Sequence, residues 1–172
     1  MDVKRIYLVG FMGAGKSSVG RALSRRLGWR LIDLDAEIER SEKLTVQEIF
    51  QRLGEPRFRQ LERQHLENAA GRQNVVIALG GGAYVNAENR ALIDSTGISV
   101  WLKVEFPNIL KRVKIDGTRP LFGDNDRAER LYQERLPSYS QAGLHVITDD
   151  RSSDAVAVEI AELVARMEHD SQ

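Results

Sequence analysis

The stretch GFMGAGKSS occupies residues 10–18, after an apolar segment at 6–9 and before a segment of helical periodicity at 16–27. Its first eight residues fit the phosphate-loop pattern G-x-x-x-x-G-K-[ST]. Glycines at this spacing let main-chain N–H groups turn toward phosphate oxygens, and the start of the following helix adds unpaired donors. The alternative, a flexible turn with an incidental lysine, is disfavoured by the strand before it and the helix after it. The sequence therefore predicts a nucleoside triphosphate site.

The residue types in this loop suit different parts of a triphosphate. Lys16 would reach the β- and γ-phosphates, and Ser17 would place its hydroxyl on a Mg²⁺ ion that bridges them. The N-K-x-D motif with which GTPases read their base does not occur, so a small kinase is favoured. The predicted nucleotide-binding residues of the loop are Gly13, Ala14, Gly15, Lys16, Ser17 and Ser18.

Length and composition set limits on the class of protein. The 172 residues suit a single domain with a real core, and 25 basic residues balance 25 acidic ones. We therefore expect no nucleic-acid or membrane binding through bulk charge. The absence of cysteine excludes disulfides and thiolate metal sites. No signal peptide or bilayer-spanning segment is predicted, so a cytoplasmic protein is expected.

Short apolar segments rich in β-branched residues alternate with segments of helical periodicity. This alternation predicts a three-layer α/β domain with parallel strands, joined by right-handed crossovers and covered on both faces. The predicted strands are 6–9, 31–32, 75–79, 98–104 and 144–147. The predicted helices are 16–27, 46–53, 57–70, 87–93, 107–113, 127–136 and 154–167.

Two regions depart from this alternation of strands and helices. Residues 36–74 hold more helix than one crossover needs, and residues 114–126 are polar and rich in turn formers. Insertions of this kind often cover a substrate or form a lid, although surface excursions without a role look the same in sequence.

Two carboxylates follow the second predicted strand. Asp33 and Asp35 flank Leu34, so both side chains would leave the same side of an extended backbone. Ligands of open α/β sheets bind at the carboxyl ends of the strands, which would place this pair beside the phosphate loop. The alternative is that Asp35 caps the helix at 36–40.

Arginines and glycines provide further candidate groups. Arg59 and Glu62 are three residues apart on a helix, which fits either a surface ion pair or an arginine fork held for a bound carboxylate. Gly80, Gly81 and Gly82 end the third strand and would let a ligand approach the main chain.

Two more arginines follow in the second half of the chain. Arg119 lies in the candidate lid, and Arg135 comes shortly before Pro137, where a helix end would direct it into the cleft. Taken singly, each of these arginines is more often solvated surface.

Taken together, these segments closely resemble the shikimate kinase family over nearly the whole chain. The matching segments are GFMGAGKSS (10–18), DLD (33–35), TVQEIF and GEPRFRQLE (45–62), LGGG (79–82), TRPL (118–121) and RLPSY (135–139). The resemblance implies a P-loop kinase fold like that of nucleoside monophosphate kinases, with five parallel strands in order 2-3-1-4-5. It also implies phosphorylation of shikimate at its 3-hydroxyl by ATP, on the pathway to chorismate and aromatic amino acids. A non-catalytic regulator, or a kinase for another acceptor such as gluconate, is the alternative.

The resemblance also implies roles for individual residues. Asp35, Lys16 and Arg119 would be catalytic, with Asp35 holding the ring hydroxyls, and Asp33 would join Ser17 at the magnesium site. The implied shikimate-binding residues are Asp35, Arg59, Gly80, Gly81, Gly82 and Arg135, with Phe50 and Phe58 as apolar walls and Glu62 behind Arg59. Arg112, Arg119 and Ser153 would complete the ATP site, Ser153 standing where proline is common. A monomer with an acceptor-binding insertion at about 34–62 is implied.

Overall fold

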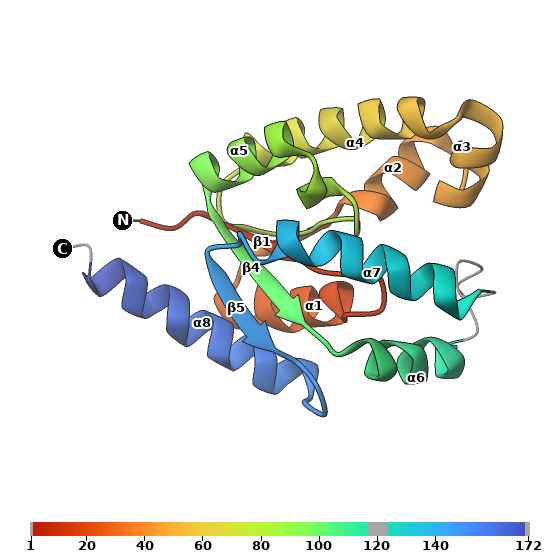
Figure 1. The fold of residues 1–172 in the computed structure, drawn as a ribbon. Helices are drawn as coiled ribbons and strands as arrows, with labels where there is room; N and C mark the ends of the chain where they lie inside the picture. Colours follow the sequence, from red (N-terminus) through yellow and green to blue (C-terminus); the bar gives the residue numbers. More distant parts are fainter. Residues whose placement is uncertain (1, 117–123, 171–172) are drawn as a thin grey trace.

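The computed structural model describes residues 2–116 and 124–170, and it contains a five-stranded parallel sheet (Figure 1). The strand order is β2-β3-β1-β4-β5, which confirms the predicted topology. In register, Ile6 of β1 lies between Val76 of β3 and Ile98 of β4. The strands are β1 (Arg5–Val9), β2 (Arg30–Asp33), β3 (Val75–Ala78), β4 (Ile98–Lys103) and β5 (Leu144–Ile147).

Burial differs between the middle and the edges of the sheet. Strands β1, β3 and β4 are almost wholly buried, as their continuous apolar sequence predicts. The prediction that all strands are covered on both faces is wrong for β2 and β5, which form the two edges. Ile147, for example, the last residue of edge strand β5, is 60% exposed.

Helices lie on both faces of the sheet (Figure 1). Helices α1 (Lys16–Leu27) and α8 (Ser153–Asp170) pack against each other, while α5 (Ala87–Thr96) packs on β4. The chain moves along the sheet in opposite directions from β1 to β2 and from β3 to β4, so right-handed crossovers place α1 and α5 on opposite faces. A methyl group on Gly20 would lie 2.8 Å from Leu31 Cδ1, so α1 approaches the sheet closely there.

The helix-rich insertion has a small core of its own. Between β2 and β3 the chain forms α2 (Leu34–Glu42), α3 (Val46–Leu53) and α4 (Glu55–Ala70). Thr45 and Glu48 form a capping box that starts α3. The core of the insertion consists of Ile38, Ile49, Phe58 and Leu61. This second core gives α4 a fixed position beside the main sheet.

The last two helices before β5 flank the predicted lid. They are α6 (Phe106–Asp116) and α7 (Asn125–Tyr139). The lid was predicted at 114–126, and its residues 117–123, with Arg119, lie outside the described residues. A 3₁₀ helix, η1 (Ala83–Val85), follows the triple glycine.

The predicted helix end before Pro137 is wrong, because α7 continues through Pro137 to Tyr139. A proline so close to the end of a helix removes one main-chain bond. Tyr139 is buried, and its hydroxyl donates to the Gly81 carbonyl at 2.5 Å, which holds the last turn in place.

Candidate active site

The phosphate loop has the backbone that its glycines predict. Gly13 and Gly15 have φ values of 81° and 93°, and Gly15 is the N-cap of α1. The ammonium group of Lys16 donates to the carbonyls of Gly10 and Phe11, so it lies inside the loop where a phosphate would be held. Ser17 and Ser18 are in the first turn of α1, where main-chain N–H groups lack helical partners.

The two aspartates of the DLD segment differ in position: one precedes α2 as its N-cap, and the other lies inside its first turn. Asp33 Oδ2 accepts a hydrogen bond from the Ser17 hydroxyl at 2.7 Å, and Asp33 Oδ1 accepts from Ala36 N at 3.2 Å. Asp33 is therefore the N-cap of α2. Both sequence expectations for Asp35 are wrong in detail: it neither caps this helix nor leaves an extended strand beside Asp33. It lies in the first turn of α2, because the helix begins at Leu34.

Arg112 joins the phosphate loop to the segment after β5. Its guanidinium donates to the Ala14 carbonyl at 3.1 Å and to the Thr148 carbonyl at 2.8 Å. The segment 148–152 is thereby held beside the loop, and Ser153 begins α8 at its end. Arg112 thus lies beside the phosphate loop.

The triple glycine brings the predicted acceptor residues together. A methyl group on Gly80 would lie 2.7 Å from Asp35 Oδ1, and one on Gly82 would lie 2.6 Å from Arg59 Nη2. One on Gly81 would lie 2.9 Å from Arg135 Nη1 and 3.6 Å from Met12 N in the phosphate loop. The side chains of Asp35, Arg59 and Arg135, which come from three helices, therefore converge on one turn beside the phosphate loop.

Arg59 is held on one side by a buried carboxylate and on the other by aromatic rings. Arg59 Nη1 donates to Glu62 Oε1 at 2.9 Å, and the Glu62 side chain is only 2% exposed. The guanidinium carbon lies 5.3 Å from the ring centre of Phe58 and 6.0 Å from that of Phe50. The pair is thus not a surface ion pair, and its geometry is that of a positioned fork.

Burial raises the pKa of Glu62, while the Arg59 guanidinium opposes that rise. Asp35 adds to the rise, which reflects the proximity of two carboxylates at Gly80. Glu62 Oε2 is buried and makes no hydrogen bond within the described residues. The acceptor end of the site therefore combines two guanidinium groups with two carboxylates in a partly dehydrated setting.

The predicted aromatic walls differ in exposure. Phe58 is buried in the insertion core and Phe50 is half-buried, their ring centres 4.7 Å apart. Both support Arg59 directly. The sequence did not single out Phe11, whose ring centre lies 5.7 Å from the Arg135 guanidinium carbon. Nor did it assign a role to Tyr139, although its spacing of four residues from Arg135 on one helix is a usable signal.

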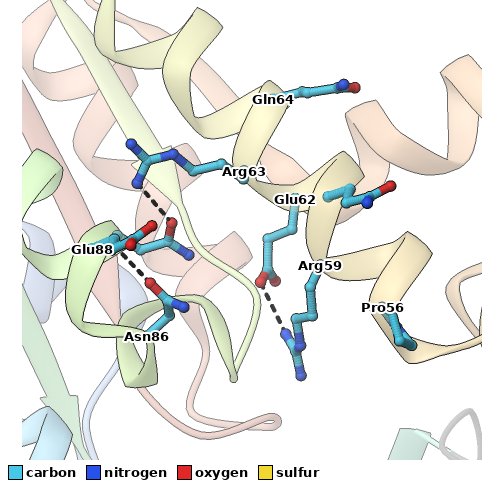
Figure 2. Close-up of a pocket in the computed structure, with 9 residues that line it drawn as sticks. Pro56, Arg59, Glu62, Arg63, Gln64, Asn86 and Glu88 are labelled. Atoms are coloured by element: carbon cyan, nitrogen blue, oxygen red, sulfur yellow. Dashed lines mark hydrogen bonds and ion pairs between the residues drawn. The ribbon is translucent and has the colours of Figure 1, made fainter.

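A cavity of about 590 Å³ adjoins Arg59 and Glu62 (Figure 2). It includes no residue of the phosphate loop, so it is not the nucleotide site. It lies between α4 and the start of α5, and polar side chains line most of it: Arg59, Gln60, Arg63, Gln64, Asn86 and Glu88.

Two features are absent from the described residues. In residues 2–116 and 124–170, no helix combines the length and apolar character needed to cross a bilayer. Within the same ranges, no cluster of three or more histidines and carboxylates could hold a metal ion by itself. An ion at Ser17 and Asp33 would therefore need phosphate oxygens or water as further ligands.

The fold and this arrangement of groups define a P-loop kinase for a small anionic acceptor. The family model described as shikimate kinase matches residues 12–165. The chain belongs to the shikimate kinase family, and the predicted resemblance is confirmed.

Individual relatives match along most of their length. The chain is 41% identical to the shikimate kinase of Brucella canis over 165 residues, which cover 94% of this chain and 82% of that protein. It is 43% identical to the shikimate kinase of Caulobacter vibrioides over 172 residues, covering 98% and 86%. The solved shikimate kinase from Acinetobacter baumannii in complex with shikimate superposes with a TM-score of 0.90 at 36% identity, covering 95% of this chain and 94% of that one.

We predict that the tyrosines of the native protein ionise only above their usual range. Burial raises the pKa of all four, that of Tyr139 to about 12. The folded state then keeps protons that the unfolded chain releases from about pH 10. Stability should therefore fall as pH rises from about 10 to about 12, Tyr139 accounting for about 3 kcal/mol.

Phenolate absorbance, followed during titration of the native protein and of the same protein in denaturant, checks this prediction. The native curve should lag behind the denatured one and rise together with loss of helical circular dichroism. Tyr139→Phe should lessen the dependence of stability on pH in this window. Superimposable titration curves for native and denatured protein would contradict the prediction.

Proposed function

We propose that the protein transfers the γ-phosphoryl group of ATP to the 3-hydroxyl of shikimate, a step toward chorismate and aromatic amino acids. The convergence of Asp35, Arg59 and Arg135 on Gly80–Gly82, beside the phosphate loop, is the observation that carries this proposal. Membership of the family supports it, as does the similarity to a relative solved with shikimate.

The acceptor chemistry matches these groups. Shikimate carries a carboxylate and neighbouring ring hydroxyls, so it needs cations at one end and a hydrogen-bond acceptor at the other. Arg59 and Arg135 suit the carboxylate, with the main chain of the glycine turn close by, because guanidinium groups bind carboxylates in a bidentate way. Asp35 suits the hydroxyls and orients the one that attacks the γ-phosphorus.

The nucleotide end supplies charge neutralisation. Lys16 and the amides of residues 13–18 hold the triphosphate, and Arg119 adds a guanidinium to the transferring phosphoryl group. We place adenine against Arg112 and the segment that leads to Ser153, whose position beside the loop supports this choice. No covalent intermediate on the enzyme is required.

The residues present fit a magnesium ion at Ser17 and Asp33. Both offer hard oxygen donors, 2.7 Å apart, at the first turn of α1. Mg²⁺ prefers such ligands and usually takes few of them from protein, the rest coming from phosphates and water. When bound, the ion neutralises charge on the β- and γ-phosphates.

The remaining parts of the proposal concern organisation. We assign residues 1–172 to one kinase domain, with the acceptor-binding insertion at about 34–62 and the lid at about 114–126. We propose a cytoplasmic monomer whose ligands are ATP and shikimate, with neither nucleic acid nor membrane as a partner.

A coupled assay of ADP release, with ATP and magnesium, tests the function. Shikimate should support turnover, whereas gluconate and nucleoside monophosphates should not. Product identification by phosphorus NMR fixes the position of the phosphoryl group. Turnover with another acceptor and none with shikimate would reject the proposal, and binding of both ligands without transfer would favour a non-catalytic regulator.

We predict that Asp35→Asn lowers turnover at least about a hundredfold, because an amide lacks the charge that orients the attacking hydroxyl. ATP affinity should stay within about twofold, since the change spares the phosphate loop. Steady-state kinetics and calorimetric ATP titration measure the two effects. Glu37→Gln is the matched control: it makes the same chemical change in the first turn of the same helix, where Glu37 forms an ion pair with the exposed Arg40. Undiminished turnover in Asp35→Asn would refute the role.

We also predict that Gly82→Ala raises the KM for shikimate about tenfold or more, with little change in melting temperature. The added methyl would lie 2.6 Å from the Arg59 guanidinium, which is the far end of a long side chain and can move aside. Gly71→Ala is the control, because its methyl would make ordinary van der Waals contacts, 3.5 Å from the Asn68 carbonyl and 3.8 Å from the Glu67 carbonyl. An unchanged KM in Gly82→Ala would show that Arg59 needs no fixed place at the turn.

A further inference from the structure

The position of the glycine turn relative to α4 determines the shape of the acceptor end. Gly82 lies against the guanidinium of Arg59, and a methyl on Gly80 would lie 3.2 Å from Glu62 Oε2. Both side chains come from α4, whereas the turn belongs to the end of β3. A small shift between these two elements would therefore change the space between Arg59 and the turn.

A buried amide connects the two elements. Asn89 of α5 is 5% exposed, and its Nδ2 donates to the carbonyl of Ala83 at 3.0 Å. Ala83 directly follows Gly82. The Oδ1 of the same amide accepts from Arg63 Nη1 at 3.1 Å, marked by a dashed line in Figure 2. Both ends of the Asn89 side chain are thus used, one toward the turn and one toward α4.

Arg63 is well placed to act as the α4 end of this connection. It lies one helical turn beyond Arg59, and Figure 2 shows both side chains on the same helix. Its Nε donates to Glu67 Oε1 at 2.7 Å, which fixes the guanidinium along α4. Asn86 accepts from Asn89 N at 3.0 Å and caps α5, which holds the base of the amide.

We propose that Asn89 and Arg63 are positioning residues for the acceptor: they hold Gly80–Gly82 at the distance from α4 that Arg59 needs to bind shikimate. The inference rests on the proposed function and adds two residues that the family resemblance did not point to. Neither residue touches the acceptor. Their effect passes through Ala83 to the turn and so falls on acceptor binding rather than on the nucleotide.

Three substitutions test the connection at its two ends. Asn89→Asp is nearly isosteric and still accepts from Arg63. It places a carboxylate oxygen, which is an acceptor, against the Ala83 carbonyl, so the hydrogen bond to Ala83 is lost. Asn89→Ala removes both bonds, and Arg63→Met keeps the apolar stem while removing the guanidinium. We expect the KM for shikimate to rise about tenfold in the Asn89 variants and at least about threefold in Arg63→Met. The KM for ATP should stay within about twofold.

Two control variants separate positioning from general loss of stability. Glu67→Gln removes the negative charge beside Arg63, while its amide oxygen can still accept from Arg63 Nε and the Arg63–Asn89 bond is left in place, so the KM for shikimate should not change. Ile160→Val weakens the core at α8, across the sheet, and should lower the melting temperature without raising that KM. Calorimetric titration of shikimate gives an independent measure of acceptor binding.

The outcomes are distinguishable. A wild-type KM for shikimate in both Asn89→Asp and Arg63→Met, with a lowered melting temperature, would assign the amide a purely structural role and overturn the inference. Arg63 is partly exposed, so Arg63→Met still decides the question if the Asn89 variants fail to fold. Absence of shikimate turnover in the wild-type enzyme would reject the proposed function and this inference with it.

Discussion

The acceptor end of this protein depends on close contact between a turn that has no side chains and three charged groups. Asp35, Arg135 and Arg59 each approach one of three consecutive glycines to within a distance that a methyl group would violate. The turn itself follows β3, a buried strand between β1 and β2, so the sheet anchors its start. Charges that come from α2, α4 and α7 thus gather around a turn at the carboxyl end of the sheet.

Electrostatics and packing support the same arrangement. Glu62 is a buried carboxylate, and Arg59 opposes the rise in its pKa that burial causes, so removing the arginine would take away the cation to which Glu62 is hydrogen-bonded. Arg59 therefore helps to hold the insertion together as well as facing the site. The aromatic pair Phe50 and Phe58 packs against the same guanidinium. For this reason, a substitution that displaces Arg59 from the turn, such as Gly82→Ala, tests the binding role of Arg59 more cleanly than a substitution of Arg59 itself.

The sequence predicted the nucleotide end better than the acceptor end, for a physical reason. A phosphate loop is a local motif whose glycines, lysine and serine lie within eight residues, so its geometry follows from short-range rules. The acceptor residues come from separate helices, and spacing alone left Arg59 and Glu62 between an ordinary ion pair and a binding group. The strand order came from the family resemblance, since alternation alone does not determine order. The predictions at Asp35 and Pro137 were wrong because a single tertiary or capping contact determines each helix boundary. Asp33 starts α2 by accepting from Ala36 N, and Tyr139 holds the end of α7. Asn89 had no sequence signal, because its partners lie 6 and 26 residues away.

The two ends of the site also differ in what would change their specificity. In the proposed function, the phosphate loop binds ATP mainly through main-chain groups, which substitutions alter little as long as the glycines remain. The proposed acceptor-binding groups are instead side chains, each set against the turn by a different helix. A kinase of this fold can therefore change acceptors by altering residues of α2, α4 and α7 while it keeps its phosphate loop. The turn is the exception, because it touches both ends: Gly81 lies against Arg135 on one side and near Met12 N on the other. A side chain at Gly81 would disturb both the acceptor end and the phosphate loop. A change of acceptor therefore has to come from the charged side chains of the surrounding helices, while the turn keeps its glycines.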